Sequence, residues 1–78
     1  MSSERLLSFN YTMEQNVITI VKTLRKGAFT VTELEIETGL SRDRLRVTLA
    51  YMLGQNLVEY RPVGMAKLYR LKIKERKR

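Results

Sequence analysis

The stretch TELEIETGLSRDRLRVTLAYMLGQNLVEY, residues 32–60, decides the fold because it holds two helix-like segments on either side of one turn glycine. In the first segment, Leu34 and Ile36 are expected to form the inner face of a short helix. Gly39 then stands where a positive φ would end that helix, and Leu40 is expected to pack beneath the turn. The pattern predicts two short helices that meet at a tight corner.

The second segment, residues 41–54, has the start signals of an amphipathic helix. The Ser41 side chain can accept hydrogen bonds from free amides of the first turn, and Asp43 suits the positive end of the helix dipole. Four apolar residues repeat at helical spacing and are expected to face the core, namely Leu45, Leu49, Met52 and Leu53. The outward side chains at the start of this helix form a cation-rich surface of Arg42, Asp43, Arg44, Arg46 and Val47.

An earlier helix is predicted between an N-cap at Thr12, or at Asn10, and a glycine stop at Gly27. Residues 28–31 then form a short extended link, which we interpret as a minimal third strand beside the later hairpin. Residues 1–11 show no clear period. The apolar stripe of this first helix consists of Met13, Val17, Ile20, Val21 and Leu24.

Two strands are predicted near the C-terminus, over residues 57–61 and 68–73. Between them, residues 62–67 contain Pro62, which is expected to stop the ladder pairing, and Gly64, which permits a turn. This segment therefore predicts a β-hairpin. Its inner face is expected to carry Tyr69, Leu71 and Ile73, and its outer face Arg70 and Lys72.

Residues 33–60 resemble the winged helix-turn-helix domains of transcription regulators, and the likeness extends over residues 12–73. That family has a leucine before the turn glycine, a Gly-Leu-Ser turn, spaced aliphatics in the second helix and a short stop before the first wing strand. The residues in those places are Leu34, Gly39, Leu40, Ser41, Leu45, Leu49, Met52, Asn56, Leu57 and Val58. The resemblance implies an α+β, mainly α fold of three helices and a C-terminal β-hairpin wing.

Two residues depart from this pattern. Asn56 replaces a glycine, and asparagine tolerates the left-handed conformation better than most side chains. Glu35 stands where the family has a small alanine against the second helix. A local reason for this glutamate is that Thr32 and Glu35 have the spacing of a capping box, which would start the helix at Thr32.

The net charge of +7 is concentrated at the C-terminal end. Residues 1–60 hold seven basic and seven acidic residues, whereas residues 61–78 hold eight basic residues and only Glu75 as an acid. Such segregation is typical of a surface that faces a polyanion, although a solvated tail has the same composition. Residues 74–78 are expected to form a basic, frayed tail.

Composition excludes several classes of function. A chain of 78 residues without cysteine or histidine has neither disulfides nor thiolate or imidazole metal ligands, so we expect no metal and no cofactor. No phosphate-cradling glycine loop or nucleophile elbow occurs, so neither an enzyme nor a small-molecule site is expected. No apolar run reaches the roughly 20 residues of a membrane span or forms a signal peptide, so we expect a cytoplasmic protein.

The resemblance and the charge together favour sequence-specific binding of double-stranded DNA by a transcription regulator. A recognition helix at residues 41–54 would enter the major groove, and a wing at residues 61–70 would contact the flanking backbone. The candidate contacts are Ser41, Arg42, Asp43, Arg44, Arg46 and Val47 on the helix, and Arg61, Lys67 and Arg70 on the wing. The alternative for the helix arginines is pairing with nearby acids, namely Glu33, Glu35, Glu37 and Asp43.

Other functions of this fold stay open at this point. An RNA-binding or ribosome-associated winged helix is one alternative, and a protein-interaction module with an acidic partner is another. The single small domain is similar in type to regulators of archaeal viruses and plasmids. Residues 1–11 are predicted to be an N-terminal extension that packs on the domain or forms a homodimer contact, because they include Leu6, Leu7, Phe9 and Tyr11.

Overall fold

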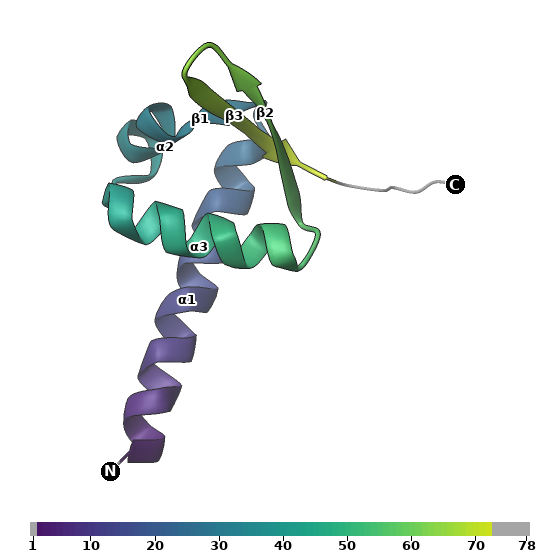
Figure 1. Ribbon diagram of the computed structural model, residues 1–78. Coiled ribbons are helices and arrows are strands. Elements are labelled where there is room, and N and C mark those ends of the chain that lie inside the picture. Colours follow the sequence, from purple (N-terminus) through teal and green to yellow (C-terminus); the bar gives the residue numbers. More distant parts are fainter. Residues whose placement is uncertain (1, 73–78) are drawn as a thin grey trace.

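A computed structural model describes residues 2–72, with side chains from residue 13 onward. Three helices and a small antiparallel sheet confirm the predicted architecture, including the short third strand (Figure 1). The elements in chain order are α1 (Ser2–Leu24), β1 (Phe29–Thr30), α2 (Val31–Thr38), α3 (Arg42–Gly54), β2 (Val58–Val63) and β3 (Ala66–Leu71).

The sheet has the strand order β1-β3-β2, so β3 lies in the middle and both of its neighbours run antiparallel to it. The hairpin turns at Gly64, whose φ of 63° lies in the left-handed region. The prediction that Pro62 stops the pairing is wrong, because Pro62 lies within β2 opposite Lys67. Proline is tolerated there since β2 is an edge strand with one side free of ladder bonds. The predicted strand residue Ile73 lies outside the described residues.

One core joins all three helices to the hairpin. Leu34 of α2 is fully buried, as the pattern predicted, but Ile36 is 77% exposed, so its predicted place in the core is wrong. Residues two apart on a helix lie on nearly opposite sides, so a single short helix cannot bury both. The buried apolar residues are Ile20, Leu24, Leu34, Leu45, Leu49, Met52, Val58 and Tyr69.

The corner between α2 and α3 forms as the sequence predicts. Gly39 has a φ of 77°, and its N–H donates to the Glu35 carbonyl oxygen at 2.9 Å, which ends α2. Ser41 is the N-cap of α3, and its hydroxyl accepts from the backbone N–H of Arg44. Asn56 takes the left-handed conformation with a φ of 63°, where the resemblance had a glycine. These local choices set the directions in which the chain enters α3 and leaves it.

The start of α2 differs from the prediction by two residues. Its N-cap is Thr30, not Thr32, and the capping box is closed by Glu33, whose carboxylate accepts from the Thr30 N–H at 2.9 Å. The capping spacing occurs twice in succession in the sequence, and Glu35 belongs to the frame that the structure does not use. Pairing of β1 with β3 holds Thr30 in an extended conformation, which selects the earlier frame.

Helix α1 also begins earlier than predicted. It is continuous from Ser2, whereas the sequence pattern predicts a start at Thr12 or Asn10. The segment contains no glycine or proline before Gly27, so nothing in the sequence interrupts the helical backbone. The first turns of α1 project past α3 and away from the rest of the domain (Figure 1). No helix within residues 2–72 is both long enough and apolar enough to cross a membrane.

The cap assignment gives a testable difference between two threonines. Thr30→Ala removes the hydroxyl that accepts from Glu33, so we expect a loss of about 1 kcal/mol in the free energy of unfolding. For a domain of this size such a loss corresponds to a lower melting temperature by about 4–8 °C. Thr32→Ala is the matched control, with an expected change within about 0.5 kcal/mol. Equal melting temperatures for Thr30→Ala and the unmodified protein would contradict the assignment.

Candidate nucleic-acid interface

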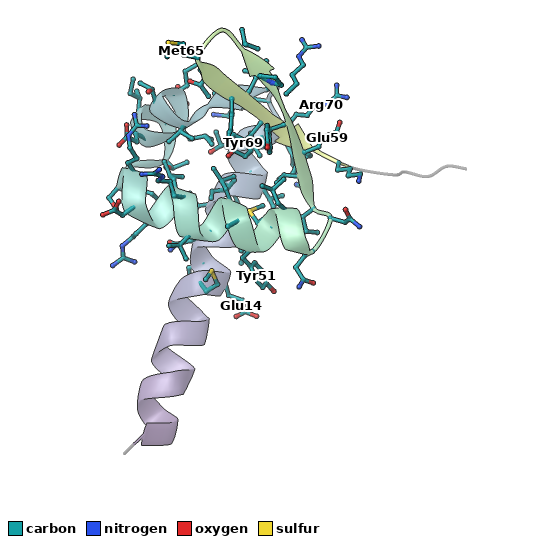
Figure 2. The ribbon with its side chains drawn as sticks, in the orientation of Figure 1. Glu14, Tyr51, Glu59, Met65, Tyr69 and Arg70 are labelled. Carbon is teal, nitrogen blue, oxygen red and sulfur yellow. The ribbon has the colours of Figure 1, made fainter. Side chains whose placement is uncertain are left out.

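A groove of about 440 Å³ lies where α2, α3 and the hairpin meet. The hairpin, β2 and β3 with their turn, is the wing, and we name this hollow the α3–wing groove. Figure 2 shows Met65 at the tip of the wing and Tyr69 between the sheet and α3. The groove is lined by Thr30, Val31, Thr32, Arg42, Arg46, Met65, Ala66, Lys67 and Tyr69. Three of the predicted contact residues, from two separate parts of the chain, therefore border one hollow.

Arg42, the first residue of α3, is held against α2. Its Nη2 donates to Thr32 Oγ1 at 3.0 Å and lies 3.3 Å from Glu35 Oε1. Both bonds use the same nitrogen, so the N–H groups of Nη1 and Nε stay available to a ligand. Glu35, the residue that departs from the family pattern, thus reaches the side of α3. The pair is half-exposed, and such pairs add only about 0–1 kcal/mol to the free energy of unfolding. Its main effect is therefore to orient the Arg42 side chain.

Arg46 is one helical turn after Arg42 and borders the same groove. Among the residues that the structure describes, it takes part in no ion pair, so its guanidinium is free for a ligand. Asp43 and Val47 lie on the side of α3 opposite the buried Leu45, and Val47 is 57% exposed. Arg44 is also exposed but lies on the flank of α3 away from Arg46. The outward surface of α3 therefore carries the cations Arg42 and Arg46 on the wing side, and Asp43 and Val47 at its centre.

Two tyrosines support the cation on the wing. The Lys67 Nζ lies 4.8 Å from the centre of the Tyr60 ring, and that ring lies 5.4 Å from the Tyr69 ring. Such contacts favour a cation over an aromatic face. Burial, helped by neighbouring Tyr60, raises the pKa of the Tyr69 hydroxyl, while the positive charge of Arg46 acts in the opposite direction. The aromatic pair connects the wall of the groove that carries Arg46 to the one that carries Lys67.

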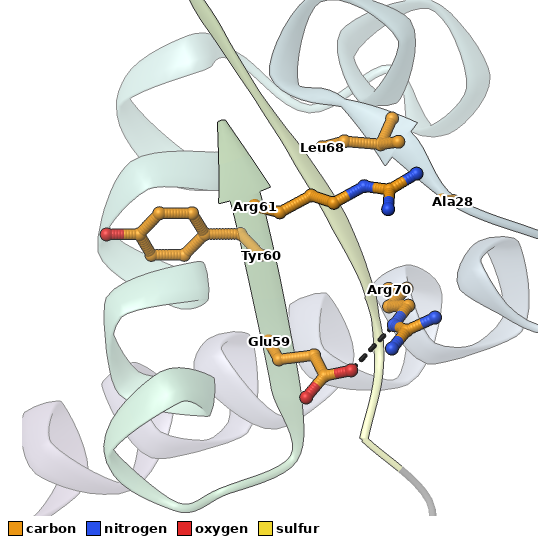
Figure 3. Close-up of a pocket in the computed structure, with 6 residues that line it drawn as sticks. All are labelled: Ala28, Glu59, Tyr60, Arg61, Leu68 and Arg70. Carbon is orange, nitrogen blue, oxygen red and sulfur yellow. Dashed lines mark hydrogen bonds and ion pairs between the residues drawn. The ribbon is translucent and has the colours of Figure 1, made fainter. Parts of the chain in front are cut away.

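The other two predicted wing contacts lie on the opposite face of the sheet. Tyr60 is paired with Tyr69, and Arg61 with Leu68, so successive side chains alternate between the two faces. In Figure 3, Arg61 points away from Tyr60, on the side of Glu59 and Arg70. Arg70 Nε donates to Glu59 Oε2 at 2.6 Å. The structure therefore separates Arg61 and Arg70 from the α3–wing groove; strand alternation predicted the outer position of Arg70, whereas that of Arg61 follows from the register of the hairpin.

Sequence reasoning also missed residues that shape the groove. The sequence predicts Thr32 to be a helix cap, but its hydroxyl instead accepts a hydrogen bond from Arg42. Tyr69 was assigned to the core, and it is buried, but it also lines the groove. The roles of both residues depend on how α2 and the wing are placed around α3. The spacing of residues along one element does not predict that placement. No cluster of three or more acidic side chains that would hold a metal ion occurs in the described part of the chain.

Comparisons with known proteins agree with this architecture. No protein-family model matches the sequence, and no curated protein sequence matches it. Among solved structures, the chain is similar to the crystal structure of a transcriptional regulator, HlyU from Vibrio vulnificus CMCP6. The TM-score is 0.75 at 23% identity, over 94% of this chain and 76% of that one. HlyU from Vibrio cholerae N16961 gives a TM-score of 0.71 at 23% identity, over 94% of this chain and 80% of that one.

These likenesses and the element order define the fold class. The chain has the winged helix-turn-helix fold, mainly helical, with α2 and α3 as the helix-turn-helix and the β2–β3 hairpin as the wing.

Proposed function

We propose that the protein binds double-stranded DNA in a sequence-specific manner and regulates transcription. In this proposal residues 41–54 enter the major groove, and the wing, residues 61–70, contacts the flanking backbone. The observation that carries the proposal is the α3–wing groove, where Arg42 and Arg46 from α3 face Lys67 from the wing. The similarity to a transcriptional regulator supports it at the level of the fold.

The contacts of α3 differ in the role that we assign them. Arg46 is the main reader of bases, because its guanidinium has no ion-pair partner among the described residues and can form a two-point contact with guanine. Arg42 contacts the backbone, since a two-point contact through either of its edges would need the nitrogen bonded to Thr32 and Glu35. The exposed Val47 suits a thymine methyl group.

The remaining site residues complete this interface. Ser41 fixes the start of α3, where Asp43 and Arg44 are exposed outside the groove, Arg44 on the flank away from Arg46. A carboxylate such as Asp43 can accept from a cytosine amino group, and Arg44 can contact a phosphate. On the wing, Lys67 faces the groove, and Arg61 and Arg70 contact phosphates from the other face of the hairpin.

Two observations favour duplex DNA over RNA. The surface presented is a helix, and the major groove of an RNA duplex is too deep and narrow for its side chains to read. Recognition of single-stranded RNA would instead need aromatic rings that are open for stacking. Here Tyr69 is buried and the half-exposed Tyr60 already carries the Lys67 ammonium group. A binding assay should nevertheless include a structured RNA and an acidic protein as alternative ligands.

The proposal predicts separate effects for the helix and the wing. Arg46→Ala should reduce the preference for a selected duplex over mixed-sequence duplex by about 1–3 kcal/mol, because a base contact is lost. Lys67→Ala should weaken binding to both duplexes alike and lower the salt slope by about 0.9, because a phosphate contact is lost. The selected duplex comes from enrichment of a random library by the unmodified protein, and affinities are measured by fluorescence anisotropy.

Lys22→Ala is the charge-matched control, since Lys22 is exposed on α1 and does not line the groove. An unchanged preference in Arg46→Ala would refute its role as the base reader. Tighter binding of a structured RNA than of any enriched duplex would refute the DNA-binding function as a whole.

We further propose that the protein acts as a homodimer through the first turns of α1. A single domain contacts few base pairs, whereas a two-fold pair reads two half-sites about one helical turn, near 34 Å, apart. The helical segment of residues 2–12 projects beyond α3, and its sequence includes Leu6, Leu7, Phe9 and Tyr11. Burial of apolar side chains against a second copy would stabilise the pair by about 25 cal/mol per Å², before the cost of association.

Sedimentation velocity tests the dimer. We expect a dimer at micromolar concentration for the full chain and a folded monomer for Leu6→Lys with Phe9→Lys, because the added charges oppose apolar contact. Ser3→Lys with Ser8→Lys adds the same charge in the same turns and should stay dimeric. A monomeric unmodified protein would contradict the proposal, as would a dimer that both double variants retain.

A further inference from the structure

A second cationic surface lies on the far side of the wing from the α3–wing groove. Two neighbouring hollows, of about 300 and 440 Å³, share Ala28 and Arg70 in their walls. The first is also lined by Glu59, Tyr60, Arg61 and Leu68, and the second by Leu24, Arg25, Lys26, Gly27 and Leu71. We call this surface, with its cations Arg25, Lys26, Arg61 and Arg70, the outer basic face.

The cations of the outer basic face come from both ends of the domain. Arg25 and Lys26 follow α1, whereas Arg61 and Arg70 lie in the wing, so they are far apart in the sequence. Together they set four cations against one lining carboxylate, Glu59, while three cations line the α3–wing groove. The wing thus has a positively charged surface on each of its two sides.

Internal pairing leaves much of this charge available. Arg70 is paired with Glu59, and Lys26 lies 3.9 Å from Glu37, but both pairs are exposed and such pairs are weak. Arg25 and Arg61 have no ion-pair partner among the residues that the structure describes. An approaching phosphate therefore meets two unpaired guanidinium groups and two cations whose pairs break at little cost.

We propose that the outer basic face binds the phosphate backbone of the DNA that flanks the segment contacted by α3, so that one duplex contacts both sides of the wing. The inference rests on the DNA-binding function proposed above and adds Arg25 and Lys26 to it. Guanidinium and ammonium groups spread over two open hollows suit a ligand with charges repeated along its length. A compact anion would need donors that converge on one point.

The same duplex is the occupant that the geometry favours. Arg61 directly precedes Pro62, which is paired with Lys67, so cations of the two surfaces occupy adjacent positions of one hairpin. Only the thickness of a single sheet separates them. DNA that leaves the α3–wing groove along the wing therefore has the outer basic face beside it.

The experiment measures binding of the full-length protein to two lengths of the enriched duplex. The shorter is about 20 base pairs, enough for two half-sites, and the longer adds about one helical turn on each side. In Arg25→Gln with Lys26→Gln, we expect the salt slope on the longer duplex to fall by about 1.8, at about 0.9 for each lost phosphate contact. Binding to the shorter duplex should be unchanged. Lys22→Gln removes a positive charge from α1 at a position that lines neither hollow, and this variant should match the unmodified protein on both lengths.

The contrary results distinguish failure of this inference from failure of the proposed function. If the unmodified protein binds the longer duplex but the Arg25 and Lys26 variant binds it equally well, the inference is wrong and the proposed function stands. The inference is also wrong if the variant loses equal affinity for both lengths of duplex. It is likewise wrong if the variant loses only the capacity to bind two duplexes at once. If the unmodified protein binds no duplex, the proposed function and the inference fail together. A melting temperature equal to that of the unmodified protein confirms that the variant is folded.

Discussion

Burial of one small apolar core is the constraint on which the rest of this structure depends. Ile20 of α1, Leu34 of α2 and Leu45 of α3 are all fully buried, and Val58 and Tyr69 bring both strands of the wing against the same helices. In a chain of this size no second core exists in the described residues to hold any element separately. The distance and angle between α3 and the wing are therefore consequences of how these few side chains pack.

The candidate interface follows from that packing. Tyr69 takes part in the core on one side and in the groove on the other, so the core directly positions a ring that lines the groove together with Arg46 and Lys67. Thr32 and Glu35 in turn hold Arg42 from α2. The charges that face the groove are thus placed by neighbours that come from other elements. The two sides of the wing also take their cations from different elements, since Arg25 and Lys26 on the outer side follow the end of α1.

Local signals in the sequence predicted the fold well at positions where a single residue type suits a cap or a left-handed backbone conformation. Gly39, Ser41 and Asn56 each took the predicted conformation or cap. One error arose where two options were locally equal: the capping spacing occurs at Thr30 and again at Thr32, and only the pairing of β1 with β3 decides between them. The site was less predictable. That Arg61 lies on the far face from Lys67, and beside a surface shared with Arg25, depends on strand register and tertiary packing.

We propose that α3 and the wing side of the groove bind duplex DNA as one surface. Amide chemical shifts of the labelled full chain, recorded during titration with an enriched duplex, test it most directly. We expect the largest changes on residues 42–47 of α3 and on residues 64–67 of the wing, with little change at the buried Ile20 and Leu34. Changes confined to residues outside both segments, or equal changes with a structured RNA of the same length, would contradict it.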